Sequence, residues 1–265
     1  MKIHHLRNAT FVIESRGRFI LIDPMLGEKG SFPPFAKKRF KPRRNPLVNL
    51  PSNACSVLDQ VNICLITHSQ KLGIKALQHT DHLDIAGEEF LRSKNTPVAT
   101  LARDAQVLKR YGINIHVELK YWKPHPFLGG EIVAVPAQHG HSWIHILMAN
   151  GAGYVLQLPD EPSIYISGDT IYTSDVERAL KELKPDIAVM ASGTATLDIS
   201  KPILMSMDEL IQFVRNSPGK VVANHLEALN HCPTTRSQLK QGLEESGLLS
   251  KVYVPDDGDI LTFEK

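Results

Sequence analysis

The chain has 265 residues, 42% of them hydrophobic, so it is long enough to bury a substantial core and too apolar to be disordered throughout. Its formal net charge of +2 is nearly balanced, which by itself implies neither a nucleic-acid partner nor an acidic membrane partner. The three cysteines are odd in number and widely spaced, which excludes a disulfide framework as the basis of the fold.

The first 53 residues indicate strands followed by a long loop. Residues 2–6, 10–15 and 18–22 alternate or run apolar, which predicts three short strands. The start lacks the apolar centre of a signal peptide, and no stretch is apolar enough for a membrane helix, so we expect a cytoplasmic protein with no membrane partner. Residues 27–53 are rich in proline and glycine and predict a loop of functional length.

From residue 61 onward, short apolar segments alternate with amphipathic ones. No repeat or low-complexity linker interrupts them, so we expect residues 1–265 to form a single α/β domain with two sheets and helices outside. Strands are predicted at 61–66, 97–101, 113–118, 131–136, 153–158, 163–167, 186–192, 220–225, 251–255 and 259–265. Helices are predicted at 85–94, 103–112, 176–184, 207–216 and 235–247.

Five imidazole or carboxylate side chains come directly after the predicted strands. Ligand sites in layered α/β folds gather at the carboxyl ends of strands, so these side chains are expected to meet. Histidine together with aspartate suits Zn, Mn or Fe. The sequence therefore predicts a metal site rather than five unrelated polar positions. The five residues are Asp23, His68, His139, Asp169 and His225.

The segment HTDHLD, residues 79–84, contributes further ligands. His79, Asp81 and His82 are too close together in the sequence to bind one ion comfortably, but they could serve two neighbouring ions. Two-metal hydrolytic sites hold their ions roughly 3.5–4 Å apart and activate a water between them. The segment therefore favours a site with two ions.

These motifs resemble those of the metallo-β-lactamase superfamily, and more narrowly of metal-dependent hydrolases close to the ascorbate-6-phosphate lactonases. The superfamily's hallmark is T-H-x-H-x-D-H after a strand; Thr67-His68 matches its first part and residues 79–82 match its second. Later in the chain QHG with His139, GDT with Asp169 and NHLEALNHC with His225 match the remaining motifs in order. The resemblance covers nearly the whole chain.

The resemblance implies an αβ/βα four-layer sandwich, with two mixed sheets, helices outside and the site at one edge. It implies two Zn or Mn ions and an activated hydroxide that Asp81 would orient, which makes Asp81 the expected catalytic residue. The first ion would be held by His68, His79 and His139, the second by Asp81, His82 and His225, and Asp169 would bridge the two.

The chain departs from the family pattern between His68 and His79, which are eleven positions apart instead of two. Residues 70–78 are inserted between them. The insertion either bulges out as an extra helical turn and leaves His68 at the site, or it moves His68 away, in which case a single ion is expected.

Other polar residues near these motifs have two interpretations each. His141 lines the pocket or is a surface group, and His231 contacts substrate or supports the metal site. Asp23 fixes the tautomer of a ligand histidine or caps a strand end. Asp84 fixes the tautomer of a ligand histidine or caps a helix. Cys232 is expected to be a small buried residue rather than a nucleophile.

Taken together, we expect a metal-dependent hydrolase that acts on an ester, a lactone or a phosphoester small molecule. The basic run at residues 37–44 carries six positive charges and indicates either a phosphorylated substrate or a solvated loop. The alternatives are a nuclease or phosphodiesterase acting on nucleic acid, which the balanced charge disfavours, and a non-catalytic metal-binding protein with a degenerate site. The sequence is also compatible with a homo-oligomer.

Overall fold

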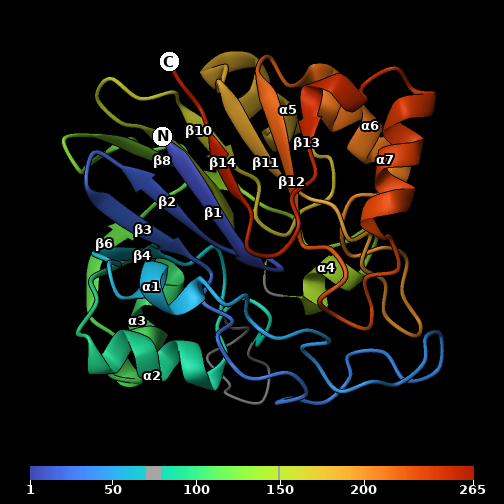
Figure 1. The fold of residues 1–265 in the computed structure, drawn as a ribbon, viewed down its shortest axis with the longest axis horizontal. Helices are drawn as coiled ribbons and strands as arrows, with labels where there is room; N and C mark the ends of the chain where they lie inside the picture. The colour runs from blue at the N-terminus through green and yellow to red at the C-terminus, as the bar shows by residue number, and fades with distance from the viewer. Residues whose placement is uncertain (70–78, 149) are drawn as a thin grey trace.

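A computed structural model describes residues 1–69, 79–148 and 150–265 and contains two seven-stranded sheets that pack against each other (Figure 1). In Figure 1, helices α1, α2 and α3 lie together on the outer side of one sheet, and α5, α6 and α7 lie on the outer side of the other. The layers are therefore helix, sheet, sheet and helix. This confirms the predicted αβ/βα sandwich.

The first sheet has the order β14-β1-β2-β3-β4-β5-β6. Its first half is antiparallel and the strands from β3 to β6 are parallel, so this is a mixed sheet. Because β14 pairs with β1, the two chain ends lie near each other (Figure 1). The strands are β1 (Lys2–Arg7), β2 (Thr10–Ser15), β3 (Arg18–Ile22), β4 (Ile63–Leu65), β5 (Val98–Leu101), β6 (Ile115–Leu119) and β14 (Ile260–Thr262).

The second sheet has the order β13-β12-β11-β10-β9-β8-β7. The strands from β10 to β13 are parallel, and those from β7 to β10 are antiparallel. The strands are β7 (His125–Phe127), β8 (Gly130–Pro136), β9 (Ala152–Gln157), β10 (Ile164–Ile166), β11 (Ile187–Ala191), β12 (Lys220–Asn224) and β13 (Val252–Tyr253).

Four of the helices that cover the sheets, α2, α5, α6 and α7, begin at a residue whose side chain caps the helix. Helices α6 and α7 start with reciprocal capping boxes, Ser206 with Glu209 and Thr235 with Gln238. No helix among the described residues is both long enough and apolar enough to cross a lipid bilayer. The helices are α1 (Ala54–Leu58), α2 (Ile85–Ser93), α3 (Ala102–Arg110), α4 (Ile144–Leu147), α5 (Ser174–Arg178) with a π-helical continuation (Ala179–Leu183), α6 (Met207–Asn216), α7 (Arg236–Glu245) and a 3-10 turn (Leu249–Lys251).

Successive side chains of a strand point to opposite faces of its sheet, so one face packs against the other sheet and the opposite face packs against helices. In β2, Phe11 and Ile13 face the interior between the sheets, whereas Val12 packs into the cluster beneath α1, α2 and α3. In β11, Val189 faces the interior and Met190 packs beneath α5, α6 and α7. Both sheets are therefore buried on both faces, and the polar residues are displaced to the strand ends, where the candidate site forms.

Candidate metal centre

The side chains that the sequence marks as ligands meet at one edge of the sandwich, in the loops that follow β4, β8, β10 and β12. They form two adjacent groups, and the potential ligand atoms within each group lie within 4.8 Å of one another. All of these residues are buried except His79, which is partly exposed. The first group is His68, His79 and His139, and the second is Asp81, His82, Asp169 and His225.

Asp169 belongs to the second group and also approaches the first. Its Oδ2 atom is 3.5 Å from Nε2 of His139 in the first group. The same oxygen is 3.2 Å from Nε2 of His82 and 3.5 Å from Nε2 of His225 in the second group. A single carboxylate thus reaches both groups, which is the geometry that a bridging ligand requires.

His68 lies at the site in spite of the insertion that follows it. Its ring centroid is 4.7 Å from that of His79 and 5.3 Å from that of His139. Gly151 leaves the space that His68 occupies, because a Cβ atom at position 151 would lie 2.6 Å from Cβ of His68. The extra helical turn expected at residues 70–78 lies outside the described residues.

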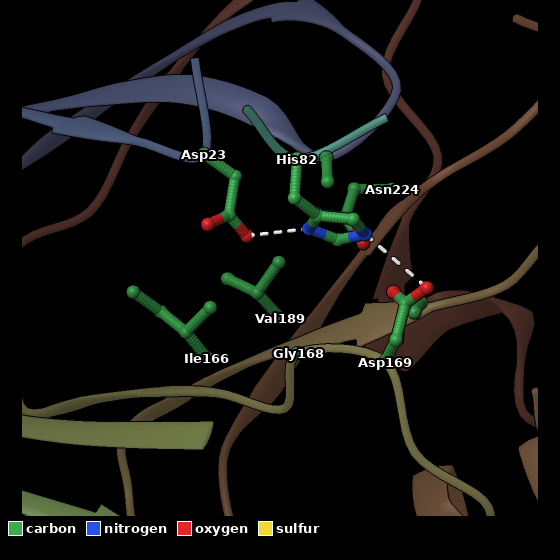
Figure 2. Close-up of a pocket in the computed structure, with 9 residues that line it drawn as sticks. Asp23, His82, Ile166, Gly168, Asp169, Val189 and Asn224 are labelled. Atoms are coloured by element: carbon green, nitrogen blue, oxygen red, sulfur yellow. Dashed lines mark hydrogen bonds and ion pairs between the residues drawn. The ribbon is translucent and has the colours of Figure 1, made fainter. Parts of the chain in front are cut away.

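Asp23, at the end of β3, holds the ligand-bearing loops together (Figure 2). Its Oδ2 atom accepts hydrogen bonds from Nδ1 of His82 at 2.8 Å and from Oγ1 of Thr67 at 2.6 Å, while its Oδ1 accepts from the Thr67 N–H at 2.8 Å. The hydrogen bond at Nδ1 fixes the tautomer of His82 and leaves Nε2 facing Asp169. Asp23 therefore orients a candidate ligand, whereas Asp84 caps α2 by accepting from the Gly87 N–H at 2.7 Å.

The other buried candidate histidines are oriented in the same way. Nδ1 of His139 meets the carbonyl oxygen of Ile203 at 2.9 Å, and Nδ1 of His68 meets Oγ1 of Thr67 at 3.1 Å. Nδ1 of His225 instead meets the Sγ atom of Cys232 at 3.5 Å. Cys232 is buried as predicted, but its contact with a candidate ligand has no signal in the sequence.

Asn8, between β1 and β2, connects two of the candidate ligands through their backbones. Its carbonyl oxygen accepts from the His225 N–H at 2.9 Å, and its side-chain Nδ2 donates to the carbonyl oxygen of Asp81 at 3.1 Å. His225 also has a positive φ of 60°, a conformation that non-glycine residues rarely adopt. This role of Asn8 depends on packing between loops that are distant in the sequence.

The chemistry of these residues fits a metal site. Among the described residues, four atoms of these groups are buried and make no hydrogen bond of regular geometry, although two of them lie 3.2 Å and 3.5 Å from Oδ2 of Asp169. Leaving a buried polar group unpaired costs about 1–3 kcal/mol, so four of them in one place indicate that the site is built for a ligand. Imidazole nitrogens and carboxylate oxygens suit Zn or Mn. The four atoms are Nε2 of His68, Nε2 of His82, Oδ1 of Asp169 and Nε2 of His225.

The two groups differ in their electrostatics. Burial, and then the neighbouring His139, lower the pKa of His79 to about 3, so the first group consists of neutral imidazoles. In the second group burial alone would lower the pKa of His82, but Asp169 and then Asp23 raise it well above its usual value. Burial would raise the pKa of Asp169, but His225 and then His82 hold it well below its usual range. The carboxylates are therefore ionised, and a cation would replace the protons on the imidazoles.

Figure 2 also shows a small cavity behind the second group, between the two sheets. It has a volume of about 10 Å³, which is room for about one water molecule, and its polar wall includes Asp23, His82, Asp169 and Asn224. The Oδ1 atom of Asn224 is buried there without a hydrogen-bond partner among the described residues. His79 is the one candidate ligand that is partly exposed, so we expect the centre to be reached from its side.

The remaining predicted residues lie at the periphery. Nε2 of His141 is 3.0 Å from Oε2 of Glu209, the residue that completes the cap of α6, so His141 belongs to a peripheral pair rather than to either group. His231 is 3% exposed, and its Nδ1 lies 4.0 Å from Sγ of Cys232. It therefore lies beside the second group without belonging to it.

The backbone of the basic run at residues 37–44 is anchored to the protein, while its basic residues are exposed. The carboxylate of Asp198 accepts hydrogen bonds from three consecutive backbone N–H groups of this run, those of residues 37–39. The guanidinium of Arg44 donates to backbone carbonyls of residues 30 and 31. Lys41 and Arg43 line a cavity of about 630 Å³ whose wall includes Cys232.

Comparison with known proteins agrees with this architecture. Residues 18–225 match a family model described as the β-lactamase superfamily domain. The UPF0173 protein YddR of Bacillus subtilis (strain 168) is 30% identical over 266 residues, covering 99% of this chain and 100% of YddR. A UPF0173 metal-dependent hydrolase of Caldivirga maquilingensis is 24% identical over 97% of this chain and 95% of its own length. The crystal structure of an isothiocyanate hydrolase from Delia radicum gut bacteria superposes with a TM-score of 0.87 and 32% identity over 100% of both chains.

Proposed function

Because the chain belongs to the β-lactamase superfamily and is a metal-dependent hydrolase of its UPF0173 family, we propose that it binds two divalent ions and hydrolyses a small molecule at them. The observation that carries this proposal is the meeting of two ligand groups around one carboxylate, with buried atoms that make no regular hydrogen bond. His68, His79 and His139 would hold the first ion. Asp81, His82 and His225 would hold the second, and Asp169 would bridge them.

Residues of the chain would orient the attacking water. Two bound Zn or Mn ions would supply a lowered pKa for a shared water and positive charge for the developing oxyanion. Burial would raise the pKa of Asp81, but His82 and then His225 hold it far below its usual range, so Asp81 is ionised at neutral pH. Its Oδ2 atom is 3.7 Å from Nε2 of His225, and as an acceptor it can orient the hydrogen of an attacking water.

The substrate class that we propose first is a neutral molecule with an electrophilic carbon, and an isothiocyanate is its best-supported member. The similar solved structure with 32% identity is an isothiocyanate hydrolase, and it covers the whole chain. A cavity of about 310 Å³ adjoins Thr80, which stands between two proposed ligands, and its wall includes Phe32, Ile85 and Glu89. Apolar side chains with a carboxylate favour a neutral substrate over an anionic one.

A second candidate is a lactone or a phosphorylated small molecule, as in the ascorbate-6-phosphate lactonase-like proteins. The observation that favours it is the larger cavity with Lys41 and Arg43, which reaches Cys232 beside His225. Two cations at the wall of one cavity suit an anionic group on the substrate. The same cations would be required by the alternative of a nucleic-acid substrate.

The test combines metal analysis with a substrate panel. Protein from metal-replete growth should contain about two equivalents of Zn or Mn, and it should hydrolyse benzyl isothiocyanate faster than a lactone, a phosphomonoester or a phosphodiester. Asp81→Asn should lose about 10²–10⁴-fold in turnover while it keeps its fold. The matched control is Asp160→Asn, on a side chain that is 81% exposed and remote from the site.

The outcomes separate the candidates. Preference for anionic substrates, lost on Lys41→Glu, would support the second candidate over the first. Hydrolysis of RNA or DNA with a steep salt dependence would favour the nuclease alternative. Protein without bound metal and without turnover of any class would indicate a degenerate site and overturn the proposal.

A further inference from the structure

The carboxylate of Glu209, at the start of α6, contacts both segments that follow the proposed ligands His139 and Asp169. Its Oε2 atom is 3.0 Å from Nε2 of His141, and its Oε1 atom accepts a hydrogen bond from the Tyr172 N–H at 3.2 Å. His141 comes two residues after His139, and Tyr172 comes three residues after Asp169. One side chain outside the ligand groups therefore joins the two segments.

The two segments are also bonded to each other. The Gln138 N–H donates to Oγ1 of Thr170 at 3.1 Å, and the Ile171 N–H donates to the carbonyl oxygen of Gln138 at 3.0 Å. These contacts lie directly beside His139 and Asp169, so a displacement of one segment displaces the other as well. The spacing of the two proposed ligands then depends on what fixes the pair of segments in place.

Helix α6 is a fixed support for the Glu209 carboxylate. Oε2 of Glu209 accepts from the N–H of Ser206 at 2.8 Å and from its hydroxyl at 3.0 Å, and Oγ of Ser206 accepts from the Glu209 N–H at 3.4 Å. The helix in turn buries Leu210, Phe213 and Val214 in the apolar cluster between the second sheet and its helices. A capping box needs only the contacts to Ser206, so the contacts to the two ligand-bearing segments are additional.

The segment that leads into α6 holds the first of these segments directly. The carbonyl oxygen of Ile203 meets Nδ1 of His139 at 2.9 Å, and that of Pro202 accepts from the His141 N–H at 3.2 Å. The ring of His139 and the backbone that follows it are thus held by residues 202–209. Glu209 extends the same support to the segment after Asp169.

This support matters because a bridging ligand tolerates little change in spacing. Oδ2 of Asp169 is 3.5 Å from Nε2 of His139, and both atoms would bind the first ion. Binding sites must be held within about 0.5 Å of their working geometry. A wider spacing would leave Asp169 with one ion only, and the two ions would no longer share this ligand.

We propose that Glu209 is a positioning residue that sets the spacing of His139 and Asp169 and thereby lets one carboxylate serve both ions. The inference rests on the proposed function, since it requires two bound ions. Glu209 belongs to neither group of ligands. It acts through His141 and Tyr172, so its loss should alter how the two ions are coupled.

Electron paramagnetic resonance of the Mn²⁺-loaded protein tests this role. Mn²⁺ ions that share bridging oxygen ligands are magnetically coupled, and the wild type with two equivalents of Mn²⁺ should show a coupled spectrum. At equal bound Mn²⁺, Glu209→Ala should shift the spectrum toward that of isolated Mn²⁺. Its affinity for Mn²⁺, measured by titration of the metal-free protein, should fall about 10-fold, as is typical when a group that orients a ligand is removed.

Two variants separate positioning from the loss of a helix cap. Gln238→Ala is the matched control, because Gln238 holds the same place in the capping box of α7 and accepts from its own cap residue, Thr235. It should lower the melting temperature as Glu209→Ala does, but keep the wild-type spectrum and affinity. Glu209→Gln keeps an oxygen for Ser206 and loses the acceptor for Tyr172, so it should recover the melting temperature without recovering the spectrum.

The outcomes distinguish this inference from the proposed function. If the wild type binds two coupled ions and every Glu209 variant that folds keeps the same spectrum and affinity, the positioning role alone is overturned. It is also overturned if Gln238→Ala changes the spectrum as much as Glu209→Ala, since the effect would then come from the loss of a helix cap. Wild-type protein that binds no pair of coupled ions overturns the proposed function, and this inference with it.

Discussion

The Sγ atom of Cys232 lies 3.5 Å from Nδ1 of His225, in the place where His82 and His139 have an oxygen acceptor. Groups that hold the outer nitrogen of a ligand histidine typically contribute 10–100-fold to metal affinity. The thiol is therefore expected to support the second ion, although it does not face it.

Cys232→Ala should weaken binding of the second ion by about 10-fold, and Cys232→Ser should stay close to the wild type because a hydroxyl can replace the contact. Competition with a chromophoric chelator measures both affinities. The matched control is Cys55→Ser, because Cys55 is an exposed residue of α1. Unchanged affinity for both ions in Cys232→Ala would show that the contact has no supporting role.

Asp23 makes a stronger contact of the same kind, since a carboxylate holds Nδ1 of His82 at 2.8 Å and both the N–H and hydroxyl of Thr67. Asp23→Ala removes all three and should reduce affinity for the second ion by about 100-fold, whereas Asp23→Asn, which keeps the shape, should cost about 10-fold. Titration of the metal-free protein with Zn or Mn measures the affinity for the second ion in each variant. Wild-type affinity in both variants would mean that neither the charge nor the shape of Asp23 matters to the site.

Much of this site could be predicted from the sequence because polar residues that end apolar strands meet at one edge when the strands share a sheet. The strand-end rule points to four of the seven proposed ligands, and the full set of seven was implied by the resemblance of the motifs to those of the family. The position of His68 could not be decided in this way, because eleven positions of spacing allow it to lie inside or outside the site. Only packing against Gly151 and the rings of His79 and His139 settles where the side chain lies.

The longer helices and most strands were also predictable, since each carries a clear period of 3.6 or 2. Helices α1 and α4 were missed because they have five and four residues, too few to display a period. The contacts between distant loops were missed for another reason. Asn45 and Asn230 are 185 positions apart, and nothing in either local sequence records their pairing.

Gly151 provides a direct test of the contribution of His68. In Gly151→Ala the new Cβ would lie 2.6 Å from Cβ of His68 and 2.7 Å from the carbonyl oxygen of Thr67, so the loop that carries His68 must shift. We expect the metal content to fall from two equivalents to one and the free energy of unfolding to fall by about 1–3 kcal/mol. Mass spectrometry under native conditions counts the ions.

The control for that variant is Gly242→Ala in α7, where the nearest atom to a new Cβ is the flexible Sδ of Met207 at 3.1 Å. It should keep both ions. Two tightly bound ions in Gly151→Ala would show that His68 is dispensable for the first site.

Removal of the metal should lower the melting temperature without unfolding the protein at room temperature. The core between the sheets is built from apolar residues of both sheets and contains none of the proposed ligands, so the fold does not depend on the ions. Ions present at 1,000 times their dissociation constant stabilise by about 4 kcal/mol, which corresponds to roughly 10 °C for a chain of this size. Thermal melts before and after treatment with a chelator measure the shift, and circular dichroism at room temperature should not change.

Asp169→Asn, which weakens the contact to both groups, should show a smaller shift on chelation. An equal shift in that variant would mean that Asp169 does not join the two groups, because the loss of a shared ligand must reduce what the ions contribute to stability.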